Sequence, residues 1–409
     1  MAIAINSHLI HACIDARNVM HGSTVNSEND IIFSFILPLV VFSKAIFAKG
    51  LFKTRLRFSL VDFFVIFIGV VLLLWSGFGD ALIGLGKTIR FFFFSIFFYF
   101  SSRIYFYNSK NPKIDFLGFF HGNLILSIFI SFVALYWADD ILSVYRLSVP
   151  GAHPIPFSIM LGASLLYCLF NLIYHYATRC YFLCIWHSGL LGFVGIVLVL
   201  SNTRGVIVSL IISFIVSIGF YLIKIRKTLV VSVKTFCCVA VLSFIGFAIT
   251  NRYIDSLGMP LIRGLSLIFQ EDKGESINTR LVAQGDAIYM FEDSAFLGVG
   301  TGNFGSYSLL EYPHNIFLEI GAENGIVGLF LLIIILSLGG LHLIKIFEVD
   351  EDMIFNLFLL SAIVYFFIEA QFSLAIWMNK FLFYIYGFII SCYQNYVVNS
   401  PCKTRSYNG

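Results

Sequence analysis

The sequence predicts an all-α polytopic membrane protein, and two properties of the chain lead to that prediction. Of its 409 residues, 59% are hydrophobic and only 12% are charged, which is about half of the charged fraction of a soluble domain. Long apolar runs recur along the chain, and they lack the polar–apolar alternation that the strands of a membrane β-barrel require. The net charge of +3 is small, and no dense basic cluster indicates a nucleic-acid partner.

About eleven of these runs, within a range of about ten to twelve, are long enough to cross a hydrocarbon core of roughly 30 Å. They lie near residues 31–49, 58–77, 91–107, 116–137, 157–176, 181–200, 205–223, 229–249, 326–345, 354–372 and 375–396. The predicted organisation is a polar N-terminal segment 1–30, a bundle of spans over 31–249, a large loop 250–325, C-terminal spans over 326–396, and a tail 397–409.

The basic residues between the spans predict the orientation. If the spans alternate, those counted here fall on one side, and they are Lys44, Lys49, Lys53, Arg55, Arg57, Arg103, Lys110, Lys113, Lys224, Arg226, Lys227, Lys345, Lys403 and Arg405. By the positive-inside rule this side is the cytoplasm. The loop 250–325 then lies on the outer face, as does the N-terminal segment, and the tail 397–409 lies inside.

The outer loop is the one long polar stretch between spans. It contains a helical stretch from about Ser276 to Ser294, a Gly-rich turn at 298–305 and the block Y-P-H-N-I-F-L-E-I-G-A-E-N-G at 312–325. The turn lacks the G-K-[ST] ending of a phosphate-binding P-loop. We therefore predict a flexible turn that brings two loop helices together. The second helix is predicted to open with Pro313 at its first position, and to end or kink at Asn324 and Gly325.

His314 is the candidate catalytic residue of this block. In the first turn of a helix, the positive end of the helix dipole disfavours a charged imidazole. The ring then stays neutral near pH 7, as a general base requires. Asn315, Glu319 and Glu323 follow at spacings that place them on one helix face. The alternative interpretation of His314 is a surface histidine at a helix cap.

Two arginines occupy unusual positions. Arg204, in N-T-R-G, lies at the outer end of the sixth span, and Arg280, in I-N-T-R-L, lies on the first loop helix. An arginine at a membrane boundary is costly unless it is paired, and guanidinium groups suit bidentate phosphate binding. With the helix N-terminus near His314, the two arginines predict a pyrophosphate site. The alternative for Arg204 is a side chain that reaches to lipid headgroups.

Taken together, these motifs resemble those of a known family. The T-R-G and N-T-R-L motifs, G-x-G-x-x-x-F at 298–304 and P-H-N-I-F-L-E-x-x-A-E-N-G-I-V-G at 313–328 resemble the O-antigen polymerase and O-antigen ligase superfamily of bacterial envelope proteins. The resemblance covers about residues 200–330. One departure is the predicted outer N-terminus, because the family usually has twelve spans with both ends inside.

The resemblance implies a GT-C-like glycosyltransferase of the bacterial inner membrane, with its active site on the periplasmic side and no metal or cofactor. The donor is a glycan on undecaprenyl pyrophosphate. The family uses a loop histidine, matched by His314, and arginines that hold the lipid pyrophosphate, matched by Arg204 and Arg280. A chain-length regulator and a flippase are the partner proteins that the resemblance implies.

These inferences combine into one hypothesis for the reaction. His314 accepts the proton of an acceptor hydroxyl, Asn315 orients the imidazole or the acceptor, and Glu319 and Glu323 support the loop or the acceptor. A lipid-linked repeat unit as acceptor makes the protein a polymerase, which the Y-P-H-N form of the block favours. Lipid A–core as acceptor makes it a ligase. The alternative from another class is a transporter of lipid or solute.

Overall fold

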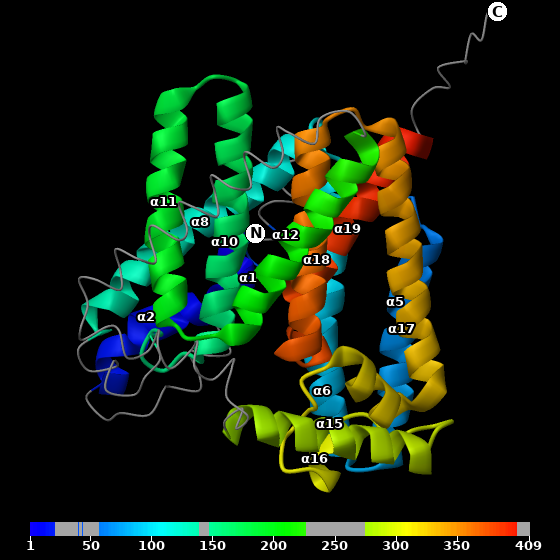
Figure 1. The fold of residues 1–409 in the computed structure, drawn as a ribbon. Coiled ribbons are helices and arrows are strands. Elements are labelled where there is room, and N and C mark those ends of the chain that lie inside the picture. The colour runs from blue at the N-terminus through cyan, green and yellow to red at the C-terminus, as the bar shows by residue number, and fades with distance from the viewer. Residues whose placement is uncertain (21–39, 41–42, 44–56, 139–146, 226–274, 399–409) are drawn as a thin grey trace, which may run out of the picture. The chain divides into compact units, whose positions relative to one another are not determined.

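The computed structural model describes residues 1–20, 40, 43, 57–138, 147–225 and 275–398. These residues form helices and connecting turns, with no strand anywhere among them (Figure 1). Eight of the described helices are long and apolar enough to cross a membrane, so the predicted all-α polytopic class is confirmed. The predicted spans 31–49 and 229–249 lie almost entirely outside the described residues, as do residues 250–274 of the outer loop.

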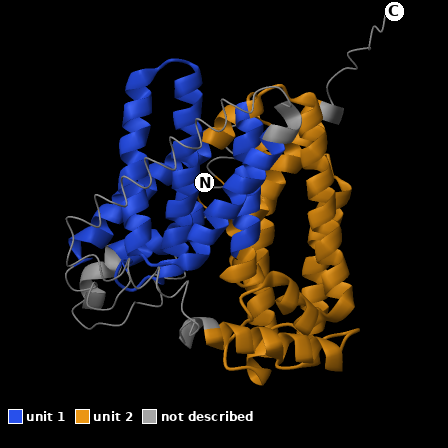
Figure 2. Cartoon of the chain, in the orientation of Figure 1, with its two compact units in different colours: residues 1–39, 118–274, 354–369 blue, residues 40–117, 275–353, 370–409 orange. Residues whose placement is uncertain are grey.

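The chain divides into two compact units, and each is assembled from segments that are distant in the sequence (Figure 2). The first unit comprises Met1–Leu39, Gly118–Gly274 and Ile354–Glu369. The second unit comprises Val40–Leu117, Glu275–Met353 and Ala370–Gly409. Arg204 therefore belongs to the first unit, whereas Arg280 and His314 belong to the second.

The first unit is a helical bundle with polar contacts in its interior. Its helices are α1 (Ala2–Ile5), α2 (Ser7–Met20), most of α8 (Pro112–Tyr136), α10 (Pro154–Ala177), α11 (Tyr181–Leu200), α12 (Arg204–Ile225) and most of α18 (Met353–Phe372). The buried Asn123 amide donates to Ser164 Oγ at 2.8 Å and accepts from Asn6 at 2.9 Å. These contacts satisfy buried polar groups, and they join α8 to α10 and to the helical start of the N-terminal segment.

The second unit includes the described part of the loop 250–325. Its helices are α5 (Leu60–Trp75), η3 (Ser76–Phe78), α6 (Ala81–Phe91), the π-helix η4 (Phe92–Ile96), α7 (Phe97–Tyr107), α15 (Glu275–Asp293), α16 (Phe304–Tyr307), α17 (Ile316–Val349), η6 (Ile376–Met378), α19 (Lys380–Tyr393) and the π-helix η7 (Gln394–Val398). The candidate membrane helix over α6, η4 and α7 runs from Ala81 to Tyr107. It begins well before the predicted start at residue 91. The predicted start was too late because Lys87 and Arg90 interrupt the apolar pattern of the sequence.

Arg103 is a correction to the loop assignment. The side chain lies inside α7 and is fully buried, and its Nε and Nη2 donate to the two carboxylate oxygens of Asp62 on α5 at 2.8 Å each. Tyr99 Oη donates to the same carboxylate at 2.6 Å, and Arg103 Nη1 donates to Ser391 Oγ on α19 at 3.1 Å. Arg103 thus joins three helices of the second unit and is no longer a marker of orientation, because loop residues carry that rule.

The loop helices are arranged as the sequence predicts. The helix predicted from about Ser276 is α15, and three glycines of the turn that follows it have positive φ, at Gly298, Gly300 and Gly302. The turn brings α15 and α17 together, because the Val299 and Gly300 N–H groups donate to carbonyls of α17 at 2.9 Å each.

The kink predicted at Asn324 and Gly325 is also present. Gly325 has φ 61° and ψ −157° inside α17, a backbone conformation that glycine tolerates and other residues do not. The first turns of α17, before Gly325, therefore point in their own direction and remain part of the loop structure rather than a straight extension of the span.

Candidate active site

The backbone at His314 differs from the prediction in one respect. His314 lies before the helix rather than in its first turn, because α17 begins at Ile316 and its N-cap is Asn315. His314 has φ 58°, a left-handed conformation that is uncommon for a residue other than glycine. Pro313 precedes this turn instead of opening the helix. Strained backbone of this kind is concentrated at functional sites, so the conformation of His314 is consistent with a functional role.

Two consecutive backbone carbonyls bring His314 and Arg280 together. His314 Nδ1 lies 3.2 Å from the carbonyl oxygen of Ser373, and Arg280 Nη1 donates to the carbonyl oxygen of Phe372 at 2.9 Å. Phe372 ends α18. The N-T-R-L arginine of α15 and the histidine before α17 are therefore held at adjacent residues of one connection, although 34 positions separate them in the sequence.

The Ser373 carbonyl also selects the form of the His314 ring. A carbonyl oxygen only accepts hydrogen bonds, so Nδ1 must carry the proton in this contact. In the neutral ring Nε2 then carries the lone pair, which is the state that a general base needs. The contact therefore selects which nitrogen carries the proton in the neutral ring, and the neutral charge of the ring, which the sequence attributes to the helix dipole, stays a prediction.

Glu319 and Glu323 lie on one face of α17, as the spacing predicts, and both side chains are fully buried. Lys87 on α6 joins them, with Nζ 2.5 Å from Glu319 Oε1 and 2.7 Å from both carboxylate oxygens of Glu323. Glu319 Oε2 also accepts the Ile376 N–H at 2.9 Å. The two acids therefore join the start of α17 to α6 and to η6. They thereby help to position the turn at His314, which directly precedes this helix.

Tyr312 connects the histidine to the charged groups. Its ring centroid lies 4.4 Å from that of His314, with the planes at 54°. Burial raises the pKa of the Tyr312 phenol, and the negative charges of Glu319 and Glu311 raise it as well, while Arg280 opposes them. The phenol consequently stays protonated at neutral pH and offers an O–H donor beside the imidazole.

Asn315 has a structural task in this arrangement. Its Oδ1 accepts the N–H groups of Phe317 and Leu318 at 3.0 and 3.1 Å, which satisfies two of the donors left free at the start of α17. The predicted helix N-terminus next to His314 is therefore present, and the side-chain oxygen of Asn315 caps it. The role of Asn315 in orienting the imidazole or the acceptor stays a prediction.

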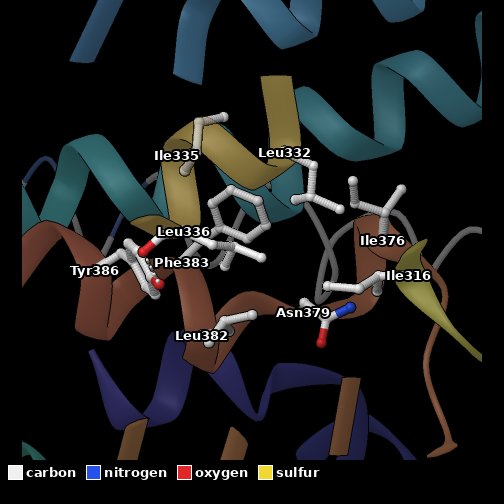
Figure 3. Close-up of a pocket in the computed structure, with 9 residues that line it drawn as sticks. All are labelled: Ile316, Leu332, Ile335, Leu336, Ile376, Asn379, Leu382, Phe383 and Tyr386. Atoms are coloured by element: carbon white, nitrogen blue, oxygen red, sulfur yellow. Dashed lines mark hydrogen bonds between the residues drawn. The ribbon is translucent and has the colours of Figure 1, made fainter. Parts of the chain in front are cut away.

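An apolar pocket adjoins the start of α17. Figure 3 shows it between α17 and the η6–α19 segment, with Ile316 and Ile376 at one end. Its lining residues are Ile316, Leu332, Ile335, Leu336, Ile376, Asn379, Leu382, Phe383 and Tyr386. Because Ile316 is two residues from His314 and Ile376 binds Glu319, polar and apolar surfaces meet at the start of α17.

Comparison with family models gives a match over part of the chain. Residues 189–333 match the family model for the O-antigen ligase. The match supports the superfamily that the motifs resemble, and it extends from α11 to the first half of α17. It contains Arg204, Arg280 and His314 together. No curated protein matches the chain.

Two basic residues, Arg204 and Lys87, differ in their relation to the matched segment. Arg204 is the first residue of α12 in the first unit, so its contribution to a pyrophosphate site stays a prediction. Lys87 lies outside the matched segment and was missed from the sequence. Its signal was a basic residue in a segment predicted to be on the outer side, the same signal that identified Arg204. The carbonyls of Phe372 and Ser373 had no signal, because any residue supplies a carbonyl.

Proposed function

We propose that this protein is a glycosyltransferase that polymerises a surface polysaccharide at the outer face of a bacterial inner membrane. The donor is a glycan on undecaprenyl pyrophosphate, and the acceptor is a lipid-linked repeat unit. The observation that supports the proposal is the pair of adjacent carbonyls, at Phe372 and Ser373, that Arg280 and His314 contact.

The proposed reaction is a single displacement. The acceptor hydroxyl oxygen forms a bond to the anomeric carbon of the donor sugar as the bond from that carbon to the phosphate oxygen breaks. His314 Nε2 takes the hydroxyl proton, and the electron pair of the broken bond leaves with undecaprenyl pyrophosphate. A base positioned within hydrogen-bond reach of the attacking group contributes roughly 10²–10⁴-fold to such a step.

Charge stabilisation of the leaving group falls to the arginines in this proposal. Arg280 and Arg204 bind the pyrophosphate, and preorganised cationic donors of this kind act most strongly where the leaving charge develops. Glu319 and Glu323 act through position, because Lys87 and the Ile376 N–H occupy their oxygens. The apolar pocket beside Ile316 offers a surface that is compatible with an isoprenoid donor.

The substitution His314→Ala tests the base. We expect loss of long-chain surface polysaccharide with the protein present at its normal level, measured by gel electrophoresis of the surface glycolipid. His342→Gln is the matched control, because His342 lies on α17 and its Nδ1 contacts the Leu338 carbonyl of that same helix. Normal chain length and amount in His314→Ala would show that the catalytic assignment is wrong.

The substitution Arg280→Lys tests the pyrophosphate role. A lysine keeps the positive charge but loses the forked pair of donors, so we expect activity to fall by about tenfold or more, as the loss of one charge-assisted hydrogen bond implies. The measurement is transfer from a synthetic polyprenyl pyrophosphate donor, with substrate concentration varied. Full activity in Arg280→Lys contradicts bidentate binding.

A ligase is the second candidate, because the matched family model carries that description and does not separate ligases from polymerases. Deletion of the protein separates the two candidates. A single repeat unit on lipid A–core indicates that a polymerase was lost. Absence of repeats on the core, with long chains still on the carrier lipid, indicates that a ligase was lost.

A transporter instead predicts that purified protein transfers no sugar, and that His314→Ala leaves surface polysaccharide intact.

A further inference from the structure

A second group of basic side chains lies one helical turn from Lys87. Arg90 follows Lys87 by three residues on α6, and such a spacing places two side chains on neighbouring positions of a helix surface. The carbon at the centre of the Arg90 guanidinium lies 5.3 Å from the centroid of the Trp377 ring on η6. Lys380 Nζ, at the start of α19, lies 4.3 Å from the centroid of the Phe94 ring.

The two aromatic rings connect these cations into one cluster. The Phe94 and Trp377 centroids are 5.8 Å apart. Arg90 and Phe94 are neighbours along α6 and η4, and Trp377 and Lys380 are neighbours along η6 and α19, so each helix contributes one cation and one ring. We call these four residues the cation–aromatic cluster. All of them belong to the second unit.

The cluster has an uncompensated positive charge. Among the residues that the structure describes, no carboxylate forms an ion pair with Arg90 or Lys380. A cation above a ring gains roughly 0.5–2 kcal/mol, but the ring does not satisfy the N–H donors as an anion does. Lys380 is half-buried and Phe94 is buried. The two cations and two rings therefore have no acidic partner in the part of the chain that the structure describes, and an anion would satisfy their free N–H donors.

The position of the cluster indicates which anion this is. Arg90 lies in the candidate membrane helix Ala81–Tyr107, next to the strongly apolar run that starts at Phe91, and Lys380 is the first residue of the apolar helix α19. Basic and tryptophan side chains at the ends of apolar runs lie at the level of lipid headgroups. The anionic groups available at that level are phosphates, to which arginine binds as a fork and lysine as a point charge.

We propose that Arg90, Phe94, Trp377 and Lys380 form a binding site for the phosphate group of a membrane lipid. The lipid is either an anionic phospholipid of the bilayer or the polyprenyl pyrophosphate donor, and both present the same phosphate chemistry. The site borders the candidate active site, since Ile376, the neighbour of Trp377, donates its N–H to Glu319. Only the donor alternative rests on the proposed function.

The test uses the purified full-length chain in a non-ionic detergent. Phosphatidylglycerol, a short polyprenyl pyrophosphate and a diacylglycerol without phosphate are titrated separately, and bound lipid is measured by native mass spectrometry. The variant is R90Q/K380Q, which removes both charges. The matched control is Lys345→Gln, because Lys345 Nζ also lies near an aromatic ring, 5.6 Å from the centroid of Tyr393, outside the cluster.

We expect R90Q/K380Q to bind at least one phosphate lipid about tenfold more weakly or worse, as expected for losing a charge-assisted contact, with diacylglycerol unchanged. A loss confined to phosphatidylglycerol assigns the site to bilayer lipid, and a loss of polyprenyl pyrophosphate binding assigns it to the donor. Equal binding of both phosphates by the variant and the wild type overturns the proposal.

Two further measurements keep this outcome separate from folding and from catalysis. If the double variant does not fold, Arg90→Gln alone is measured, because the Arg90 side chain is exposed. His314→Ala protein should bind both lipids as the wild type does. If His314→Ala retains polysaccharide synthesis, the proposed function is wrong. If R90Q/K380Q also binds phosphatidylglycerol more weakly, the lipid site is nevertheless supported.

Discussion

At the residue scale, the candidate site depends on a few side chains whose neighbours determine their chemical state. His314 has a left-handed backbone and bonds a carbonyl through Nδ1. Tyr312 stays a phenol because it is buried near carboxylates. Neither state is a property of the residue type alone. The His314 ring nitrogen contacts Ser373, far away in the sequence, whereas the Tyr312 phenol responds to burial and to the nearby Glu319 and Glu311.

Lys87 carries the residue-scale prediction. Its Nζ contacts two fully buried carboxylates, and the lysine side chain itself is only 11% exposed. The substitution Lys87→Gln leaves Glu319 and Glu323 facing each other without a cation. Removing one partner of a buried pair costs about 3–5 kcal/mol, so we expect a clear fall in melting temperature of the purified protein.

Two comparisons test the cause of that fall. The double variant K87Q/E323Q should recover part of the lost stability, because it removes one of the two unpaired carboxylates. Lys113→Gln should cost less, about 1 kcal/mol or below, since the pair of Lys113 with Asp350 is more exposed and exposed pairs contribute little. Equal losses in Lys87→Gln and Lys113→Gln would contradict the buried-charge explanation.

At the element scale, glycines with positive φ determine how the loop meets the membrane helices. Gly298, Gly300 and Gly302 allow the turn that joins α15 to α17, and Gly325 allows the kink within α17. The kink lets the Ile326 N–H donate to the Ala295 carbonyl at 2.8 Å. The start of α17 is thereby held against α15, and Arg280 and His314 come within reach of the same connection.

The substitution Gly325→Ala is the prediction at this scale. A Cβ at this position would lie 2.3 Å from the Phe296 carbonyl oxygen, and the backbone has φ 61°. Strained backbone costs roughly 1–3 kcal/mol before the clash is added. We expect reduced yield of folded protein and loss of polysaccharide synthesis. Gly340→Ala, in the same helix with nothing within 4 Å of the added Cβ, should keep both properties.

At the scale of the whole molecule, composition and apolar runs were sufficient for the fold class, because no water-soluble fold hides so much apolar surface. Tyr181–Leu200 has the predicted limits, and α15 and the Gly325 kink follow local signals for helix start and glycine backbone. The start of the third span was wrong. A charged residue lowers the mean hydropathy of its window, so the segment around Lys87 was assigned to a loop. Only the tertiary contacts show that Lys87 has buried partners.

The site was predictable to a similar extent. His314, Arg280, Glu319 and Glu323 were found from motif and spacing, and the structure brings these four residues to one region. Side-chain patterns cannot indicate which carbonyl will meet a histidine, so the role of Ser373 was out of reach. The left-handed turn at His314 was missed for a related reason, since Pro313 favours a helix start and a turn about equally.

The orientation of the whole chain gives a further prediction. In a variant without native cysteines, Leu309→Cys places a thiol at a position that is 86% exposed in the loop. A membrane-impermeant maleimide should label it in intact cells with a permeabilised outer membrane. Glu351→Cys, exposed between α17 and α18, should be labelled only after the inner membrane is opened. The reverse pattern would place the candidate active site in the cytoplasm.

The buried pair of Asp62 and Arg103 has a consequence for how the protein is made. Asp62 lies in the first turn of α5 and Arg103 lies near the end of α7. A buried charge is costly until its partner is in place, so the ends of α5 and α7 become stable once the two charges meet. Ser391 and Gln394, which also accept hydrogen bonds from the arginine, follow it by 288 and 291 residues. The second unit is therefore completed only after α19 has been made, and a chain truncated before α19 should become a substrate for membrane quality control.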